Sequence, residues 1–421
     1  MNRLASSPKA SVRHPTALVR GAVKPPRTPR HRRGVFLLLL AFVGGMLGAT
    51  VAQLEVAQTQ VTVEFGRRVT IVARFRAPRP IERVYLFLHP EGTLNTYSGE
   101  MEAQGTGWKR TFTLKEWPLP PFATVYYWFQ VHYRDGSTEQ TPAFTFEYTD
   151  TRFTWETLAE PPIFVHWTQG DPTIAQEIIN AAQEAMQRTR RQWLAPSPQR
   201  VDVYLYPNAT ALESLLQDAP EWAGASAYPA LGTILLLHPT TPTELAQRKW
   251  EVAHEVVHVA LYAALQEAAV TLPWWLQEGL ASLAEPEVRE EYPAVLAQAW
   301  QKKALMPLSD LCAPSLWKAD EVQLAYAEAA SFVRFLHQRY GARKLYRLLL
   351  AYATGLPCEE GVREVFGQPL SELEALWQQE TLAYTGPALS QKIPVVLLWS
   401  GMLALVALSF GLVFVWIRRF A

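Results

Sequence analysis

Apolar and polar residues alternate along much of the segment 55–150. The clearest case is the stretch from Val125 to Tyr133, in which every second residue is apolar. This period of two is typical of β-strands with one buried face. Further runs with the same period lie at 61–65, 69–75, 83–88, 109–114 and 143–148. About seven short strands separated by turn residues predict an immunoglobulin-like β-sandwich over 55–150.

The pattern changes at Thr151 to alternating strands and helices. Short apolar strands are expected at 163–167, 201–206 and 231–237, and an amphipathic helix at 172–194. A second helix is expected to begin at Thr241, because Thr241-Pro242-Thr243-Glu244 combines a capping box with proline in the first turn. These elements predict an α+β domain over residues 151–386.

The two ends of the chain have a different composition. Residues 1–33 hold nine Lys or Arg and no acidic residue, which predicts a basic, disordered cytoplasmic tail. The apolar segment 34–52 is expected to be a signal peptide or an N-terminal transmembrane anchor, since small residues that suit signal peptidase end it. The long basic leader favours the anchor.

An uncharged run of 25 residues, 393–417, precedes Arg418 and Arg419. Its length suits a C-terminal transmembrane helix, and arginines are typical of a cytoplasmic end. We therefore expect a protein of the cell membrane that contacts the lipid bilayer. Residues 53–392 would be extracytoplasmic and the C-terminus cytoplasmic.

Charge and cysteine content narrow the function further. Lys and Arg number 39, as do Asp and Glu, so no excess of positive charge points to nucleic acid as a partner. The two cysteines, Cys312 and Cys358, are too far apart in sequence for a cysteine zinc site. Outside the cytoplasm we expect them to form a disulfide, with two free thiols as the alternative.

The most specific chemical signal is His254-Glu255-Val256-Val257-His258, which lies in the helix that begins at Thr241. Residues four apart share a helix face, so His254 and His258 can reach one metal ion. Glu255 stands between them, where a carboxylate can accept a proton from water. This combination is the chemistry of zinc-dependent hydrolysis. Two core histidines bonded to backbone carbonyls are the alternative, but that reading leaves Glu255 without a purpose.

A third ligand is expected on the next helix, within Trp274-Trp275-Leu276-Gln277-Glu278-Gly279. We favour Glu278, because the neighbouring Gly279 is unfavourable in an ordinary exposed helix. Gly279 instead predicts a close approach to the first helix or to the metal. Glu285 lies seven positions later, on the same face of an extended helix, and is the second choice.

Together these motifs resemble the gluzincin zinc metallopeptidases, in particular the peptidase MA-like family, over about residues 155–385. The resemblance implies a zincin-type α+β catalytic domain that binds Zn2+ through His254, His258 and Glu278. Glu255 would be the general base. The segment from Tyr326 resembles the helix that closes the active site in this family, which makes Tyr326 a candidate oxyanion donor.

The chain departs from the better-known gluzincins at two positions. Gln277 and Leu283 stand where those proteins carry Asn and Asp. The partner that should orient a ligand histidine therefore cannot be named from the sequence.

The expected protein is a membrane-anchored, extracytoplasmic zinc metallopeptidase that cleaves a peptide or protein substrate. It would combine a β-sandwich, a zincin domain and two transmembrane segments, and strand 232–237 would pair with the substrate backbone. One alternative is a catalytically inactive zincin that binds partners through the sandwich, although a structural zinc site has no use for Glu255. A zinc hydrolase of non-peptide substrates fits the same residues.

Overall fold

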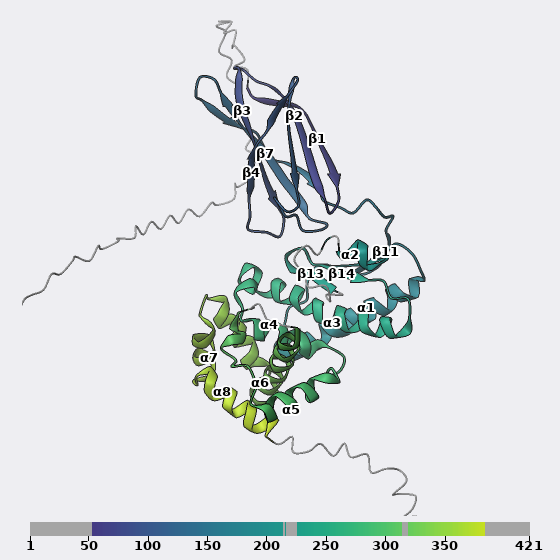
Figure 1. Cartoon of the computed structure of the whole chain (residues 1–421), viewed down its shortest axis with the longest axis vertical. Helices are drawn as coiled ribbons and strands as arrows, with labels where there is room; N and C mark the ends of the chain where they lie inside the picture. The colour runs from purple at the N-terminus through teal and green to yellow at the C-terminus, as the bar shows by residue number, and fades with distance from the viewer. Residues whose placement is uncertain (1–52, 214, 216–224, 314–318, 384–421) are drawn as a thin grey trace, which may run out of the picture. The chain divides into compact units, whose positions relative to one another are not determined.

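The computed structural model describes residues 53–213, 215, 225–313 and 319–383 of the chain. Its first part consists of two antiparallel sheets (Figure 1). One has the strand order β1-β2-β6-β5, and the other has the order β4-β3-β7-β8 with β9 also paired to β7. The strands are β1 (Glu55–Glu64), β2 (Arg68–Arg76), β3 (Ile81–Pro90), β4 (Tyr97–Glu100), β5 (Glu102–Gln104), β6 (Gly107–Thr113), β7 (Thr124–Tyr133), β8 (Thr138–Gln140) and β9 (Phe144–Glu147).

The strand order corresponds to the A-B-E-D and C-F-G sheets of an immunoglobulin-type sandwich. Alternate residues of β7, such as Phe129 and Val131, are fully buried in an apolar core shared by both sheets, whereas Tyr126 on the opposite face is exposed. The period of two therefore places the long strands correctly. Strands β4, β5 and β8, of three or four residues each, were not predicted.

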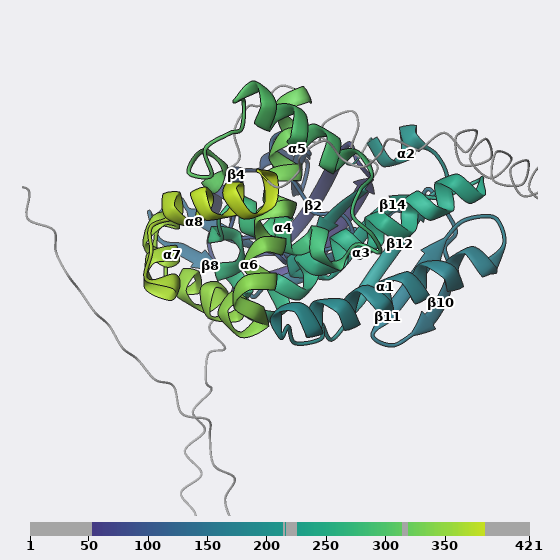
Figure 2. The ribbon, with the colours of Figure 1, turned by 90° about the horizontal axis from the view of Figure 1, so that it is seen from below.

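The second part is built on a five-stranded sheet with the order β10-β11-β12-β14-β13. The three inner strands are parallel, and the two outer strands run antiparallel to their neighbours. Helices α1 and α3 pack against each other and against this sheet (Figure 2). The elements are β10 (Glu156–Glu160), β11 (Ile163–Trp167), α1 (Pro172–Trp193), β12 (Val201–Tyr206), α2 (Ala209–Glu213), β13 (Ala225–Tyr228), β14 (Thr233–Leu237) and α3 (Pro242–Leu265).

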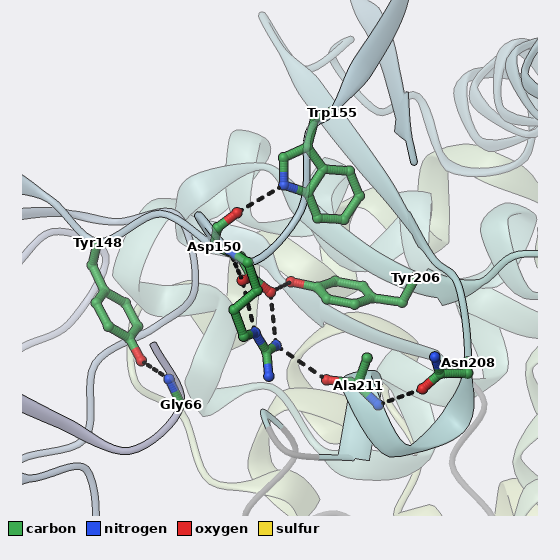
Figure 3. A network of polar contacts seen from close by, with 8 residues as sticks. Gly66, Tyr148, Asp150, Trp155, Tyr206, Asn208 and Ala211 are labelled. Carbon is green, nitrogen blue, oxygen red and sulfur yellow. Dashed lines mark hydrogen bonds and ion pairs between the residues drawn. The ribbon is translucent and has the colours of Figure 1, made fainter. Parts of the chain in front are cut away.

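Polar contacts tie the segment after the sandwich to this sheet (Figure 3). The buried carboxylate of Asp150 accepts hydrogen bonds from Arg152 and from the hydroxyl of Tyr206 at the end of β12. Its backbone carbonyl accepts a third bond from the indole of Trp155. A buried carboxylate is costly unless such donors satisfy it, so this network stabilises the junction.

Helix α3 begins as the capping signals predict. The Thr241 side chain accepts from the Glu244 backbone N–H, and the Glu244 carboxylate accepts from the Thr241 backbone N–H. Its apolar residues, including Val252, Val256 and Val257, are fully buried. The helix is therefore held along its length by the core, which gives its functional side chains a rigid base.

Helix α4 (Trp274–Ala284) packs against the long helix α6 (Ala319–Ala353). A Cβ atom on Gly279 would lie 2.5 Å from the backbone oxygen of Ala329 and 2.3 Å from Val333. Gly279 thus permits a close approach, as predicted, but the partner is α6 and neither α3 nor a metal. Helix α6 is interrupted at Gly341, where φ is 77°. It is surrounded by α5 (Glu291–Lys302), α7 (Cys358–Phe366) and α8 (Leu370–Trp377).

Two further features join distant segments of this helical part. Cys312 and Cys358 form a disulfide, as predicted, with a sequence separation of 46. Glu328 on α6 is fully buried, and its Oε1 accepts the backbone N–H of Met306 at 2.9 Å. Its Oε2 has no partner in the described part of the chain. Burial above all, with Glu374 nearby, raises the pKa of Glu328 to about 8.

The predictions of membrane-spanning segments and of a membrane localisation must be corrected. Within residues 53–383, as far as they are described, no helix is long and apolar enough to cross a bilayer. The longest helices carry charges along their length, such as Arg248, Lys249 and Glu255 in α3. The predicted segments 34–52 and 393–417 lie outside the described residues, as does the basic tail 1–33.

Candidate metal centre

Two packed helices bring the predicted ligands together. Helix α3 carries His254 and His258 on one face, and α4 carries Glu278 opposite them. The Nε2 atoms of His254 and His258 lie 3.1 Å and 3.9 Å from Oε2 of Glu278. One ligand atom from each residue lies within 4.8 Å of the other two. These three side chains form what we call the metal cluster.

The metal cluster fits a zinc ion. Ligands about 2.0–2.2 Å from a tetrahedral zinc ion lie roughly 3.3–3.6 Å from one another, so small shifts of the side chains suffice. Two imidazoles and one carboxylate are a ligand set of catalytic zinc sites, which leave a fourth position open. All three side chains are largely buried but not sealed off, with exposed fractions of 11 to 16%.

Glu285 is the hydrogen-bond partner that orients the ligand histidine His254, and it could not be named from the sequence. Its Oε1 lies 3.1 Å from Nδ1 of His254, and its side chain is 2% exposed. An ionised carboxylate can only accept a hydrogen bond, so Nδ1 carries the proton and Nε2 is the atom that faces Glu278. Arg289 donates to the same oxygen at 3.2 Å and holds the carboxylate in place.

This position excludes Glu285 as a ligand of the same ion. The expectation that it shares a face with Glu278 assumed a helix that continues through both residues. Helix α4 instead ends at Ala284, and Glu285 has the extended backbone angles φ −60° and ψ 150°. The chain therefore turns Glu285 toward the far side of the His254 ring.

The electrostatics of the metal cluster follow from this arrangement. Burial opposes a charge on His254, but hydrogen bonds to Glu278 and Glu285 outweigh burial and raise its pKa to about 10. Burial likewise opposes the charge on Glu278, but its hydrogen bond with His254 and the charge of His258 lower its pKa. A metal ion bound at Nε2 of His254 would therefore have to displace a proton from that atom.

Glu255 and Tyr326 lie beside the metal cluster. Glu255 is partly exposed, next to His254 on α3. The Tyr326 ring centroid lies 6.4 Å from that of His254 and 5.0 Å from that of Trp274. Burial, and then the charges of Glu278 and Glu255, raise the pKa of Tyr326, so its hydroxyl keeps its proton. The sequence suggests a helix that begins at Tyr326. Helix α6 instead begins at Ala319, so Tyr326 lies two turns inside it.

The strand expected to receive a substrate is not at the edge of the sheet. Strand β14 lies between β12 and β13, and both of its sides are paired. Among the described strands, β13 is the edge on this side. Strand β13 is only four residues long and shows no period in the sequence. The side chains of β14 are buried because its two faces pack into two apolar cores, Ile234 and Leu236 into one and Leu235 into the other.

Comparison with known proteins finds a family that this domain resembles. A family model described as the Peptidase MA superfamily matches residues 181–383, which include α3, α4 and most of α1. No curated protein matches the chain.

Several solved structures are similar at low scores. An M1 zinc metallopeptidase from Deinococcus radiodurans is 13% identical, with 77% of this chain and 93% of that chain covered and a TM-score of 0.33. A two-domain M1 zinc metallopeptidase mutant bound to L-arginine is 14% identical, with 77% and 94% covered and a TM-score of 0.34. A bromine derivative of BhCBM56 is 18% identical over 21% of this chain and 88% of that chain, with a TM-score of 0.18.

Scores of this size do not define a fold, so the assignment depends on the family match. The matched segment contains the whole metal cluster and Glu255. Residues 181–383 are therefore similar to the Peptidase MA superfamily and form most of a zincin-like domain, which a β-rich region precedes.

Proposed function

We propose that the protein is a zinc-dependent metallopeptidase that hydrolyses peptide bonds. The observation that carries this proposal is the convergence of His254, His258 and Glu278, with the partly exposed Glu255 next to His254 on α3. The first three residues would hold the zinc ion. When bound, zinc supplies Lewis-acid assistance to the hydrolysis.

The remaining chemistry belongs to residues of this chain. Glu255 accepts a proton from the attacking water and later passes it to the leaving nitrogen of the substrate. Glu285 keeps the His254 ring oriented, because its carboxylate accepts a hydrogen bond from Nδ1–H. The protonated hydroxyl of Tyr326 can donate a hydrogen bond to the oxyanion that develops on the substrate. The edge strand β13 offers backbone groups to an extended peptide.

An inactive zincin that serves as a binding scaffold is less well supported. A structural zinc site has four protein ligands, whereas the cluster among the described residues has three. Glu255 is also partly exposed, where a general base needs to be and a structural residue does not.

The test is a digest of an unbiased peptide library by the purified full-length protein, with and without a chelator. We expect about one zinc ion per chain and cleavage that the chelator abolishes. Glu255→Gln should lower turnover at least about 100-fold and leave zinc content unchanged, since general-base catalysis contributes that much. Glu267→Gln is the matched control, because Glu267 is an exposed carboxylate just after α3.

The outcomes separate the two functions. Zinc-loaded protein that cleaves no peptide supports the scaffold. Loss of zinc from Glu255→Gln would instead show that Glu255 is a ligand and not the base.

A further inference from the structure

A cavity of about 200 Å³ adjoins the metal cluster. His258 forms part of its wall, and so does Gln277, the residue before the ligand Glu278. The remaining wall comes from the following turn of α3, from β13, from the short helices at Pro229–Leu231 and Gln266–Thr271, and from the sandwich. A group that enters this cavity therefore lies directly beside the proposed reaction centre.

The lining is apolar and carries no formal charge. Leu231, Leu261, Ala269 and Val270 contribute aliphatic surface, and the described lining contains no Asp, Glu, Lys or Arg. The side-chain N–H of Gln277 donates a hydrogen bond to the backbone carbonyl of Leu272 at 2.9 Å. A charged group in this cavity would lose hydration without gaining an oppositely charged Asp, Glu, Lys or Arg among the described lining residues, whereas an apolar group gains from leaving water.

The cavity also borders the edge strand β13. Ala227 and Tyr228, the last residues of β13, line it. An extended peptide paired with β13 projects alternate side chains to one side, so one of them can enter the cavity. Side-chain recognition and backbone pairing thus occur at adjoining surfaces.

The sandwich contributes to the wall through the loop after β3. Gly92 in this loop has φ of +75°, and a Cβ atom there would lie 2.9 Å from Cδ2 of Leu231. Pro120 of the sandwich lines the cavity as well. The loop therefore packs directly on the helix Pro229–Leu231, and its position bears on the shape of the cavity.

We propose that this cavity is a specificity pocket for an uncharged apolar side chain next to the scissile bond, with the loop after β3 of the sandwich as one wall. The proposal rests on the proposed peptidase function. It gives the sandwich a direct role in substrate selection. Burial of one apolar side chain in such a pocket typically changes kcat/KM on the order of 10–100-fold.

The first test uses end-blocked peptides that differ only in the residues flanking the cleaved bond, which are Leu, Glu or Lys. The zinc-loaded full-length protein should favour Leu on one side of the bond by on the order of 10–100-fold. Val270→Glu should then favour Lys over Glu at that position, and Val270→Lys should favour Glu over Lys. We expect each change to be about fivefold, the effect of one charge pair near water.

The matched control is the pair Leu350→Glu and Leu350→Lys. Val270 is 69% exposed and Leu350 44% exposed, so both positions accept a charge, but Leu350 on α6 lines no described cavity. For the sandwich wall, Leu231→Ala should raise the preference for Phe over Leu, because it removes the side chain that meets Gly92. Leu94 lies in the loop of Gly92 and is 72% exposed, so Leu94→Ala should leave this preference unchanged.

Several results would overturn the proposal. These are cleavage with no apolar preference on either side of the bond, or Val270 variants that shift the preference no more than the Leu350 variants do. If the protein cleaves no peptide, the proposed function fails separately. The pocket is then tested by peptide binding to the zinc-loaded Glu255→Gln variant. Equal affinity for Leu-, Glu- and Lys-containing peptides in that assay rules the pocket out.

Discussion

Glu285→Gln is the most informative single substitution, because it separates a residue that orients a ligand from a ligand. The Glu285 carboxylate is 2% exposed and accepts from Nδ1 of His254 and from Arg289. The glutamine oxygen can still accept from Nδ1, but the negative charge that polarises the imidazole is lost. Arg289 also loses its charged partner.

The expected result is weaker zinc binding with unchanged stoichiometry. Removal of the partner of a ligand histidine typically lowers metal affinity 10–100-fold, about 1.4–2.7 kcal/mol. Glu287→Gln, an exposed carboxylate two residues later, should leave the affinity unchanged. Competition with a fluorescent zinc chelator at pH 7.5 measures the affinity, and elemental analysis at saturation measures the stoichiometry.

Two results would refute this reasoning. Unchanged affinity in Glu285→Gln would mean that its contact with His254 does not support the metal. Loss of zinc at saturating concentration, with the fold intact, would mean that Glu285 is itself a ligand and that the chain reorganises on metal binding.

Four further predictions concern the centre and the domain around it. Glu278→Gln should lose zinc affinity together with peptidase activity, as measured by metal analysis and turnover, because a neutral amide is a poor zinc ligand. Tyr326→Phe should lower kcat by on the order of 10–1000-fold and keep zinc, since one oxyanion donor contributes up to about 4 kcal/mol; unchanged kcat removes it from the mechanism. The pKa of Glu328 is raised from 4.5 to about 8, so the contribution of this group to stability is complete below pH 4.5 and is lost as the pH rises toward 8. Urea unfolding should show this fall, by at most about 1.4 kcal/mol per pH unit, and Glu328→Gln should flatten it. Finally, non-reducing mass spectrometry should find Cys312 linked to Cys358, and Cys358→Ala should lower the free energy of unfolding by about 3–4 kcal/mol.

The sequence by itself determined the features that depend on near neighbours in the chain. The capping box at Thr241 sets the start of α3, and the spacing of four between His254 and His258 puts both on one face. The alternation in β7 places its buried side chains. These signals are local, because caps and strand or helix periods involve residues a few positions apart.

Only the tertiary structure decided the features that depend on which elements pack together. Glu285 meets Nδ1 of His254 because α4 ends before it, and a periodic pattern does not show where that happens. Gly279 faces α6 and not α3, and the short strand β13 takes the edge position expected for β14. The cavity beside His258 is formed by segments from Gly92 to Gln277. Contacts between distant segments arise from the shape of the whole core, so no window along the chain contains them.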